Sequence, residues 1–148
     1  MISLKRKQSG FTIVELLIVI VVIGILAALV VTTFAGVQRK ARNAERESDI
    51  KAIHTQLEAA FQELNAYPTL TELNTASWRD TNMKSLDPEA LKDPKGSAQT
   101  LVGTATATAY GYTVTKDDGT SCNSTECTKY TLTAKRESGT DYSKNNLN

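Results

Sequence analysis

Gly10–Phe34, with the sequence GFTIVELLIVIVVIGILAALVVTTF, is an almost unbroken apolar run. It exceeds the roughly 18 apolar residues at which a membrane-spanning helix becomes the first interpretation. The run carries one carboxylate, Glu15, close to its start. A charged side chain is costly inside a bilayer, so an intramembrane carboxylate is a candidate functional residue by default. The sequence therefore predicts a membrane segment in which something must neutralise Glu15.

Basic residues stand on both sides of this run, at positions 5–7 before it and at Arg39 and Lys40 after it. With so short a leader, the positive-inside rule predicts an N-terminus in the cytoplasm and a C-terminal domain outside. An ordinary secretory signal would be cut after small residues at the end of its apolar region, yet apolar residues continue past Ala27-Ala28. We therefore expect a single-pass anchor that is retained in the cytoplasmic membrane.

The composition of the chain excludes several classes of function. Its 148 residues include 17 Lys and Arg against 16 Asp and Glu, and the two signs are intermixed. This argues against a nucleic-acid-binding domain and leaves DNA contact only to a larger assembly. The lone His54 makes a histidine metal site unexpected, and the sequence holds no nucleophile–base pair and no phosphate-binding glycine loop. We expect no enzymatic activity, no catalytic residue, no cofactor and no metal.

The order of a basic leader, Gly10-Phe11, Glu15 and a long apolar helix resembles the N-terminal region of type IV pilins and the related pseudopilins. The resemblance covers about half of the chain, strongly through Ala35 and more loosely to Thr69. It implies that residues 1–10 are a leader that a prepilin peptidase removes by cutting between Gly10 and Phe11. It also implies N-methylation of the new terminus at Phe11.

The spacing of Phe11 and Glu15 suits assembly for a physical reason. A cut after Gly10 would leave Glu15 one helical turn from the new amino group of Phe11. When the helix leaves lipid to pack among copies of itself, Glu15 of one subunit can pair with the Phe11 ammonium of a neighbour. Both buried charges are then compensated only in the assembled register. The alternative is a single-pass anchor whose Glu15 merely reaches the membrane interface.

The apolar helix is expected to continue to residue 65, because residues 37–65 contain no proline or glycine. Residues 11–36 would be the transmembrane or filament-core half of this spine helix, and residues 37–65 its amphipathic half. Many Gram-negative pilins carry a helix-breaking proline where Thr32 stands here, so a continuous helix and a locally softened one both remain open. An apolar stripe at three- and four-residue steps comprises Ile50, Ile53, Leu57, Phe61 and Leu64.

Charged residues fill the other faces of this outer half. Arg46, Lys51, Glu58 and Glu63 are expected to remain in water. The charge-mixed segment Gln38–Asp49 is either a solvated face or a site of intersubunit ion pairs.

Residues 66–148 are expected to form a globular head, and Tyr67-Pro68 to end the helix before it. Between residues 69 and 100 we expect loops with short helical turns, the clearest at Asp87–Leu91. There Asp87 can cap the turn, with proline in the first helical position.

Two later segments, Thr104–Thr115 and Lys129–Lys135, alternate with period two and predict an antiparallel hairpin. The hairpin would pack on the apolar stripe of the helix, with Thr140–Leu147 as a candidate third strand. The fold class is thus α+β, a long N-terminal spine helix packed against a small antiparallel sheet.

The two cysteines, Cys122 and Cys127, lie close together in no metal-ligand pattern, which suits a local disulfide in an oxidising compartment. The spacing is not CxxC, so a structural role is favoured over a redox role. Asp117, Asp118 and Asn123 could offer oxygens to calcium, but their spacing fits a turn better. Asn123 also begins a glycosylation triplet.

The sequence as a whole predicts a major or minor pilin, a structural subunit of a type IV pilus-like surface filament used in adhesion, motility or DNA uptake. Its partners would be further copies of itself, the prepilin peptidase, and an assembly platform with a separate motor ATPase. Before assembly it would be N-in, C-out in the cytoplasmic membrane, and afterwards extracellular. The nearest alternative is a pseudopilin of a type II secretion or competence system. A monomeric membrane-anchored binding module is a more distant one.

Overall fold

The computed structural model describes residues 10–147, so nine of the ten residues of the predicted leader lie outside the described residues. The chain forms two compact units, Met1–Gln38 and Arg39–Asn148. The first unit holds the apolar half of the long helix. The second unit, called the head below, holds the rest of that helix together with the sheet.

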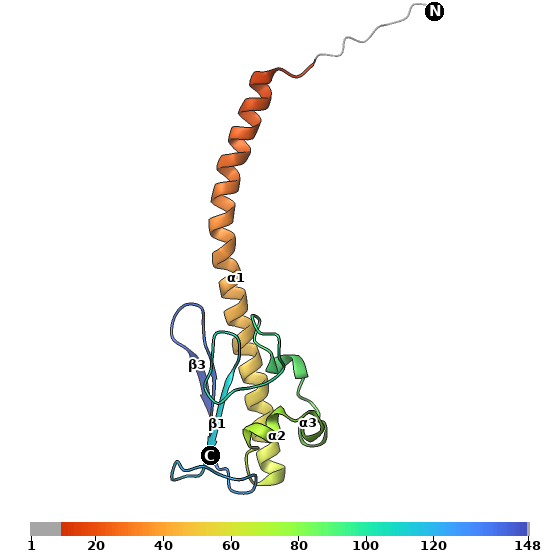
Figure 1. The fold of residues 1–148 in the computed structure, drawn as a ribbon, viewed down its shortest axis with the longest axis vertical. Coiled ribbons are helices and arrows are strands. Elements are labelled where there is room, and N and C mark those ends of the chain that lie inside the picture. The colour runs from red at the N-terminus through yellow and green to blue at the C-terminus, as the bar shows by residue number, and fades with distance from the viewer. Residues whose placement is uncertain (1–9, 148) are drawn as a thin grey trace, which may run out of the picture. The chain divides into compact units, whose positions relative to one another are not determined.

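The long helix α1 runs from Ile13 to Leu64, 52 residues without a break (Figure 1). It continues through Gly24 and past Thr33, whose hydroxyl donates to the Leu29 carbonyl at 3.0 Å. Of the two alternatives open at this point, the continuous helix is the one present in this structure. Among the described residues, α1 is also the one helix long and apolar enough to cross a membrane.

The helix ends because Asn65 adopts a left-handed conformation, with φ of 55°. Asparagine tolerates this conformation better than most residues, and its N–H donates to the Phe61 carbonyl at 2.8 Å, a common helix-terminating bond. The helix therefore stops before Tyr67-Pro68, the pair that was expected to end it. Tyr67 instead donates its N–H to the Cys127 carbonyl at 2.8 Å, which ties the chain after α1 to the disulfide loop.

Three short helical segments follow: α2 at Leu70–Asn74, α3 at Ala76–Asn82 and a 3-10 turn, η1, at Pro88–Leu91. The last confirms the predicted turn, because Asp87 accepts a bond from the Glu89 N–H and proline occupies the first turn. Helix α2 begins with a reciprocal capping box between Thr69 and Glu72.

The sheet has three antiparallel strands in the order β1-β2-β3, at Gly111–Thr115, Lys129–Ala134 and Tyr142–Asn145. The predicted hairpin is confirmed as the pair of β1 and β2, in which Thr113 lies opposite Thr131. The predicted third strand is confirmed as β3, which pairs with β2. The first strand was expected to begin at Thr104, but β1 begins at Gly111, so the predicted start is wrong.

The residues before β1 turn back on themselves instead. Thr106 and Ala109 form an antiparallel bridge, and Val102 bridges to Gly111 in parallel. A Cβ added at Gly111 would meet the Ala105 backbone nitrogen at 2.5 Å. The strand thus begins at a glycine because the preceding loop crosses too closely for a side chain.

The core of the head lies between α1 and the sheet. Ile50, Ile53 and Leu57 are fully buried, as their spacing predicts. They share one cluster with residues from the strands and loops, whose largest members are Tyr67, Tyr110, Tyr112, Tyr130 and Leu132. The predicted α+β architecture is confirmed.

Candidate functional site

The start of α1 is organised by Thr12 and Glu15. The Glu15 carboxylate accepts the Thr12 N–H at 2.9 Å and the Thr12 hydroxyl at 2.7 Å, and the Glu15 N–H donates to that hydroxyl at 3.2 Å. These bonds form a capping box that satisfies backbone donors at the helix start. Thr-x-x-Glu ahead of an apolar run is the sequence signal for this motif, which our sequence-based prediction missed.

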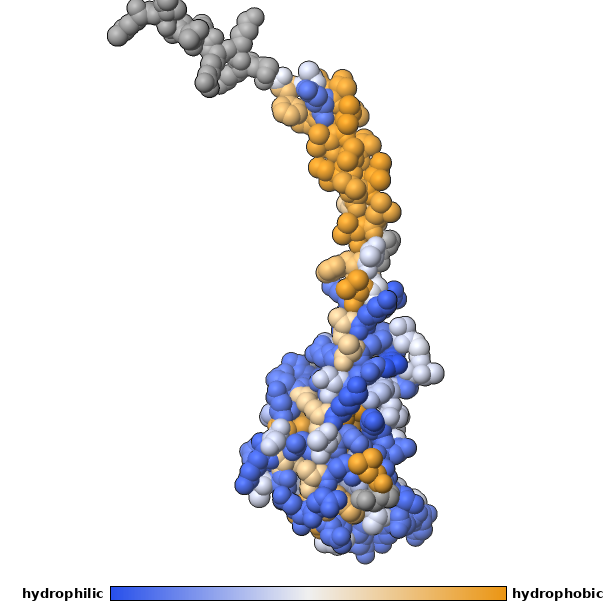
Figure 2. All heavy atoms as spheres, turned by 180° about the vertical axis from the view of Figure 1, so that it is seen from behind, coloured by the Kyte–Doolittle hydropathy of each residue, from blue (hydrophilic) through white to orange (hydrophobic). Residues whose placement is uncertain are grey.

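The remaining described residues of the first unit present an apolar surface with no cover. The large apolar side chains from Ile13 to Val31 are each exposed over about half or more of their area, from 48% at Val22 to 86% at Ile13. Figure 2 shows one face of this surface, where apolar side chains run along the helix. An exposed apolar surface of this extent is typical of a segment that contacts lipid or other protein chains. Gly10 and Phe11, the predicted cleavage positions, are exposed beside it.

The charged residues of α1 in the head have a different environment. Arg46 was expected in water, but it is 0% exposed. Its guanidinium binds both oxygens of Asp93, at 2.6 and 3.0 Å, and that carboxylate is equally buried. A two-pronged bond to a carboxylate matches the planar shape of the arginine side chain. Arg46 therefore joins α1 to the turn that follows η1.

Glu137, which follows β2, completes this cluster. It accepts two bonds from Arg42, lies 3.3 Å from Arg46 and 3.3 Å from the Lys95 ammonium. The bonds from Arg42, with Lys95 nearby, lower the pKa of Glu137 to about 2. Glu58, also expected in water, accepts a bond from the Tyr130 hydroxyl at 2.8 Å.

Asp49 stands apart from these ion pairs. Its carboxylate accepts the Tyr110 hydroxyl at 2.7 Å, and within residues 10–147 it forms no ion pair. Burial is the main cause that raises the pKa of Asp49 to about 6, and the nearby carboxylates of Glu45 and Asp93 act in the same direction. Asp49 is thus a carboxylate that lacks a cation.

Cys122 and Cys127 are joined in a disulfide with 5.2 Å between their Cα atoms. In the same loop the side chains of Asp118 and Asn123 accept the N–H groups of Thr120 and Thr125, at 2.9 and 3.1 Å. These oxygens are therefore engaged in local turns. Across the described part of the chain, no group of three acidic, histidine or cysteine side chains is placed to hold a metal.

Comparison with known proteins finds similarity over part of the chain. The family model "Prokaryotic N-terminal methylation motif" matches residues 5–31. The type II secretion system core protein G of Aeromonas hydrophila is 46% identical over 65 residues, which are 44% of this chain and 46% of that protein. The type IV major pilin protein PilA of Myxococcus xanthus is 36% identical over 61 residues, 41% of this chain and 28% of that protein. Part of this chain is thus similar to a type II secretion core protein G and to a type IV major pilin.

The matches to relatives differ in length. A longer match, to the core protein G of Klebsiella pneumoniae, is 34% identical over 91 residues, or 62% of this chain and 63% of that protein. The chain spans about half of the Aeromonas relative's length and about a quarter of the Myxococcus relative's length. No solved structure matches it.

Proposed function

We propose that this chain is a structural subunit of a type IV pilus-like surface filament, polymerised through the N-terminal half of α1. The uncovered apolar surface from Ile13 to Val31 carries the proposal, because it needs either lipid or other copies around it. The match of residues 5–31 to the methylation motif gives that surface its context. The role is structural and not enzymatic.

Processing precedes assembly in this proposal. A prepilin peptidase removes residues 1–10 by cutting between Gly10 and Phe11, and Phe11 is N-methylated. Before the filament forms, residues 11–36 anchor the chain in the cytoplasmic membrane with its N-terminus inside and residues 66–148 outside. An assembly platform with a separate motor ATPase then moves the chain from the membrane into an extracellular filament.

Glu15 sets the register between subunits. Its carboxylate accepts the backbone N–H and the hydroxyl of Thr12, the residue just before α1. The new Phe11 ammonium of a neighbouring copy would supply the positive charge that this carboxylate lacks in an apolar surrounding.

A second candidate is a pseudopilin, which builds a shorter filament for secretion or competence. The identity of 46% to a core protein G, against 36% to a major pilin, favours it. Each of the two matches covers less than half of this chain. Electron microscopy of sheared surface material separates the candidates, because a long fibre containing this chain supports the pilin and rules against a short pseudopilus.

The main test is intact mass and N-terminal analysis of the chain from its native host, in membranes and in sheared material. We expect a methylated chain that begins at Phe11 in the sheared fraction. A chain that begins at Met1 and stays wholly in membranes, in a host with active prepilin peptidase, would overturn the proposal. A monomeric anchored module would then be the better interpretation.

A further inference from the structure

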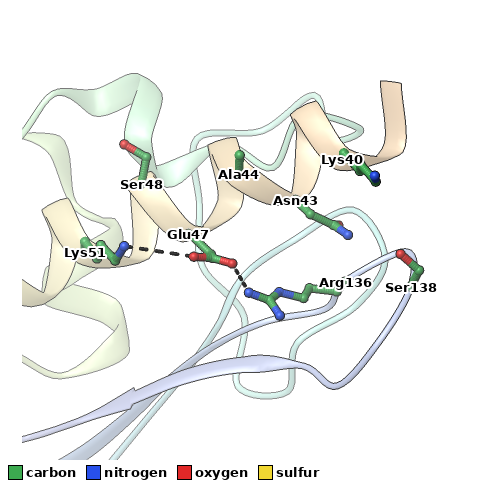
Figure 3. A pocket seen from close by; sticks show the side chains of 8 residues that line it. All are labelled: Lys40, Asn43, Ala44, Glu47, Ser48, Lys51, Arg136 and Ser138. Carbon is green, nitrogen blue, oxygen red and sulfur yellow. Dashed lines mark ion pairs between the residues drawn. The ribbon is translucent and has the colours of Figure 1, made fainter. Parts of the chain in front are cut away.

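Two grooves of opposite charge flank the same stretch of α1 in the head. The first, the basic groove, has a volume of about 500 Å³ and contains Lys40, Lys51 and Arg136 against one carboxylate, Glu47. Figure 3 shows Arg136 reaching from the segment after β2 toward Glu47, which also faces Lys51 at 3.9 Å. Glu47 is thereby engaged within its own chain, and the two lysines carry the excess positive charge of the groove.

The second, the acidic groove, has a volume of about 320 Å³ and lies between α1 and η1. Five carboxylates line it against one lysine: Glu45, Asp49, Asp87, Glu89 and Asp93, with Lys92. Arg46 neutralises only the deepest of them, Asp93. The groove therefore keeps an excess of negative charge.

The environment of Asp49 reflects the excess negative charge of the acidic groove. The Asp49 carboxylate is half-buried, bonded to the Tyr110 hydroxyl and surrounded by further carboxylates. Its raised pKa reflects burial without a compensating cation. A positive side chain brought into the groove from outside would remove that deficit.

The two grooves are separated by a ridge of small side chains. At 3.6 residues per turn, the groove-lining positions of α1 centre about 120° apart around the helix, with the buried stripe on the third side. Exposed small residues follow the face of α1 between the two groove centres, and the middle three of them also line the grooves: Ala41, Ala44, Ser48, Ala52 and Thr55. Small side chains allow another chain to approach the helix closely.

We propose that the basic groove of one copy docks against the acidic groove of a second copy, in a head-to-tail contact that repeats from subunit to subunit. Such a contact uses two different surfaces of the same chain, which is the arrangement that generates open helical assemblies. The proposal rests on the proposed function, because only a filament brings many copies into one repeated register.

Charge complementarity identifies a second copy as the partner. The whole chain has a net charge of +1, so copies approach one another with little overall repulsion while the local charges select the register. Each groove has an excess of the charge that the other lacks. The charged segment of α1 thus serves its own head through Arg46, and a neighbour through Lys40, Glu45 and Lys51.

Crosslinking in intact host cells tests the contact directly. Cells would express two tagged forms of the full chain, one with Lys51→Cys and one with Glu45→Cys, and receive a thiol-specific bifunctional reagent. The native disulfide leaves Cys122 and Cys127 unreactive. We expect several times more dimer in mixed cells than with either form alone. A matched control pairs Lys51→Cys with Glu63→Cys, an exposed position of α1 outside both grooves.

Dimers that form as readily in cells with one variant alone would indicate a symmetric contact and overturn the proposal. A mixed yield no higher than that of the Glu63→Cys control would do the same. Because this readout does not depend on recovering sheared filaments, it is distinct from the test of the proposed function. If the crosslink forms but no surface filament is found, the proposed filament function is wrong. If filaments form but the crosslink does not, only the proposed docking contact is wrong.

Charge reversal provides the second test. We expect Lys40→Glu with Lys51→Glu, or Glu45→Lys with Glu89→Lys, to lower filament yield about tenfold, because like charges then face each other. The fourfold variant should recover most of the yield, since complementarity returns with the signs exchanged. If the fourfold variant stays as low as the pairs, the basic groove holds a free anion or an unrelated acidic partner, and the proposal is wrong.

Discussion

The two halves of α1 differ in what satisfies their side chains. From Ile13 to Val31 the apolar surface has no cover among the described residues, and Glu15 is bonded only to the start of its own helix. From Arg42 to Leu57 the same helix finds its partners within the head, both for its apolar stripe and for Arg46. The apolar side chains of the first half therefore need lipid or other chains around them. In the second half, most apolar and charged side chains are already packed or paired within the head.

The difference predicts where substitutions act. Changes in the first half should alter assembly and leave the head folded, and changes in the second half should alter the stability of the head first. Each prediction below tests one side of this contrast.

The largest effect is expected from Glu15→Ala. Removing the carboxylate takes away the only acidic group of the apolar run, so we expect filaments in the sheared fraction to be lost while the chain remains anchored in the membrane. Quantitative immunoblots of sheared and membrane fractions measure both quantities.

Thr12→Ala is the matched control for Glu15→Ala. It breaks the same capping box, at a cost of about 1 kcal/mol to the helix start, and leaves the carboxylate in place. If assembly falls equally in both variants, helix capping explains the effect and the proposed registry role of Glu15 fails. If Glu15→Ala assembles normally, the contrast between the two halves of α1 breaks down.

The next effect is expected in the head, from Asp93→Ala. This change removes the two-pronged partner of buried Arg46 and leaves only Glu137, at 3.3 Å, as a carboxylate near its charge. Breaking a buried ion pair costs about 3–5 kcal/mol when the remaining charge has no other partner, so we expect a loss of about 3 kcal/mol here. Thermal unfolding of the detergent-solubilised chain, followed by near-UV circular dichroism, measures the loss. Asp80→Ala, at an exposed position, is the control that should change little.

A double variant sharpens this test. Arg46→Met with Asp93→Leu removes both charges and keeps the apolar volume, so it should recover most of the stability lost in Asp93→Ala. A double variant that is no more stable than Asp93→Ala would mean that the ion pair itself, and not the orphaned charge, determines the effect.

The sequence predicts the two halves of α1 unequally well. Apolar length and a three- to four-residue period are local signals, so the membrane run and the buried stripe of Ile50, Ile53 and Leu57 are both found correctly. The pair of Arg46 and Asp93 joins residues 47 positions apart, and no local pattern indicates that an arginine beside the stripe turns inward. Long-range pairing of this kind depends on where the loop after η1 folds back.

The same distinction separates the errors elsewhere. The capping box at Thr12 and Glu15 is a local motif and could have been predicted. The late start of β1 could not, because it follows from the approach of Ala105 to Gly111 in the folded loop. The two grooves also arise only after folding, since Arg136 and Glu89 come from segments far from α1 in the sequence.

The smallest effect is expected from the titration of Asp49. Its pKa is raised from 3.8 to about 6 in the folded head, so between these values the folded state binds more protons than the unfolded state. The contribution of Asp49 is therefore fully present below about pH 4 and is lost as the pH rises through about 6. Because the carboxylate is only half-buried, solvent screening limits the loss to about 1 kcal/mol. Glu137 acts in the opposite direction, since its lowered pKa makes the head lose stability as the pH falls from about 4.5 toward 2.

Asp49→Asn isolates the contribution of Asp49 to this pH dependence. The amide oxygen can still accept the Tyr110 hydroxyl, and the charge is absent at every pH. Unfolding of unassembled chains at pH 3.5 and pH 7.5 should show that the variant gains stability relative to the natural chain as the pH rises from the lower value to the higher one. In assembled filaments the advantage should shrink, because a lysine from the basic groove of a neighbour would compensate the natural carboxylate. If the stability advantage of Asp49→Asn is as large in filaments as in unassembled chains, Asp49 gains no cation on assembly. The acidic groove would then have no partner in a neighbouring copy.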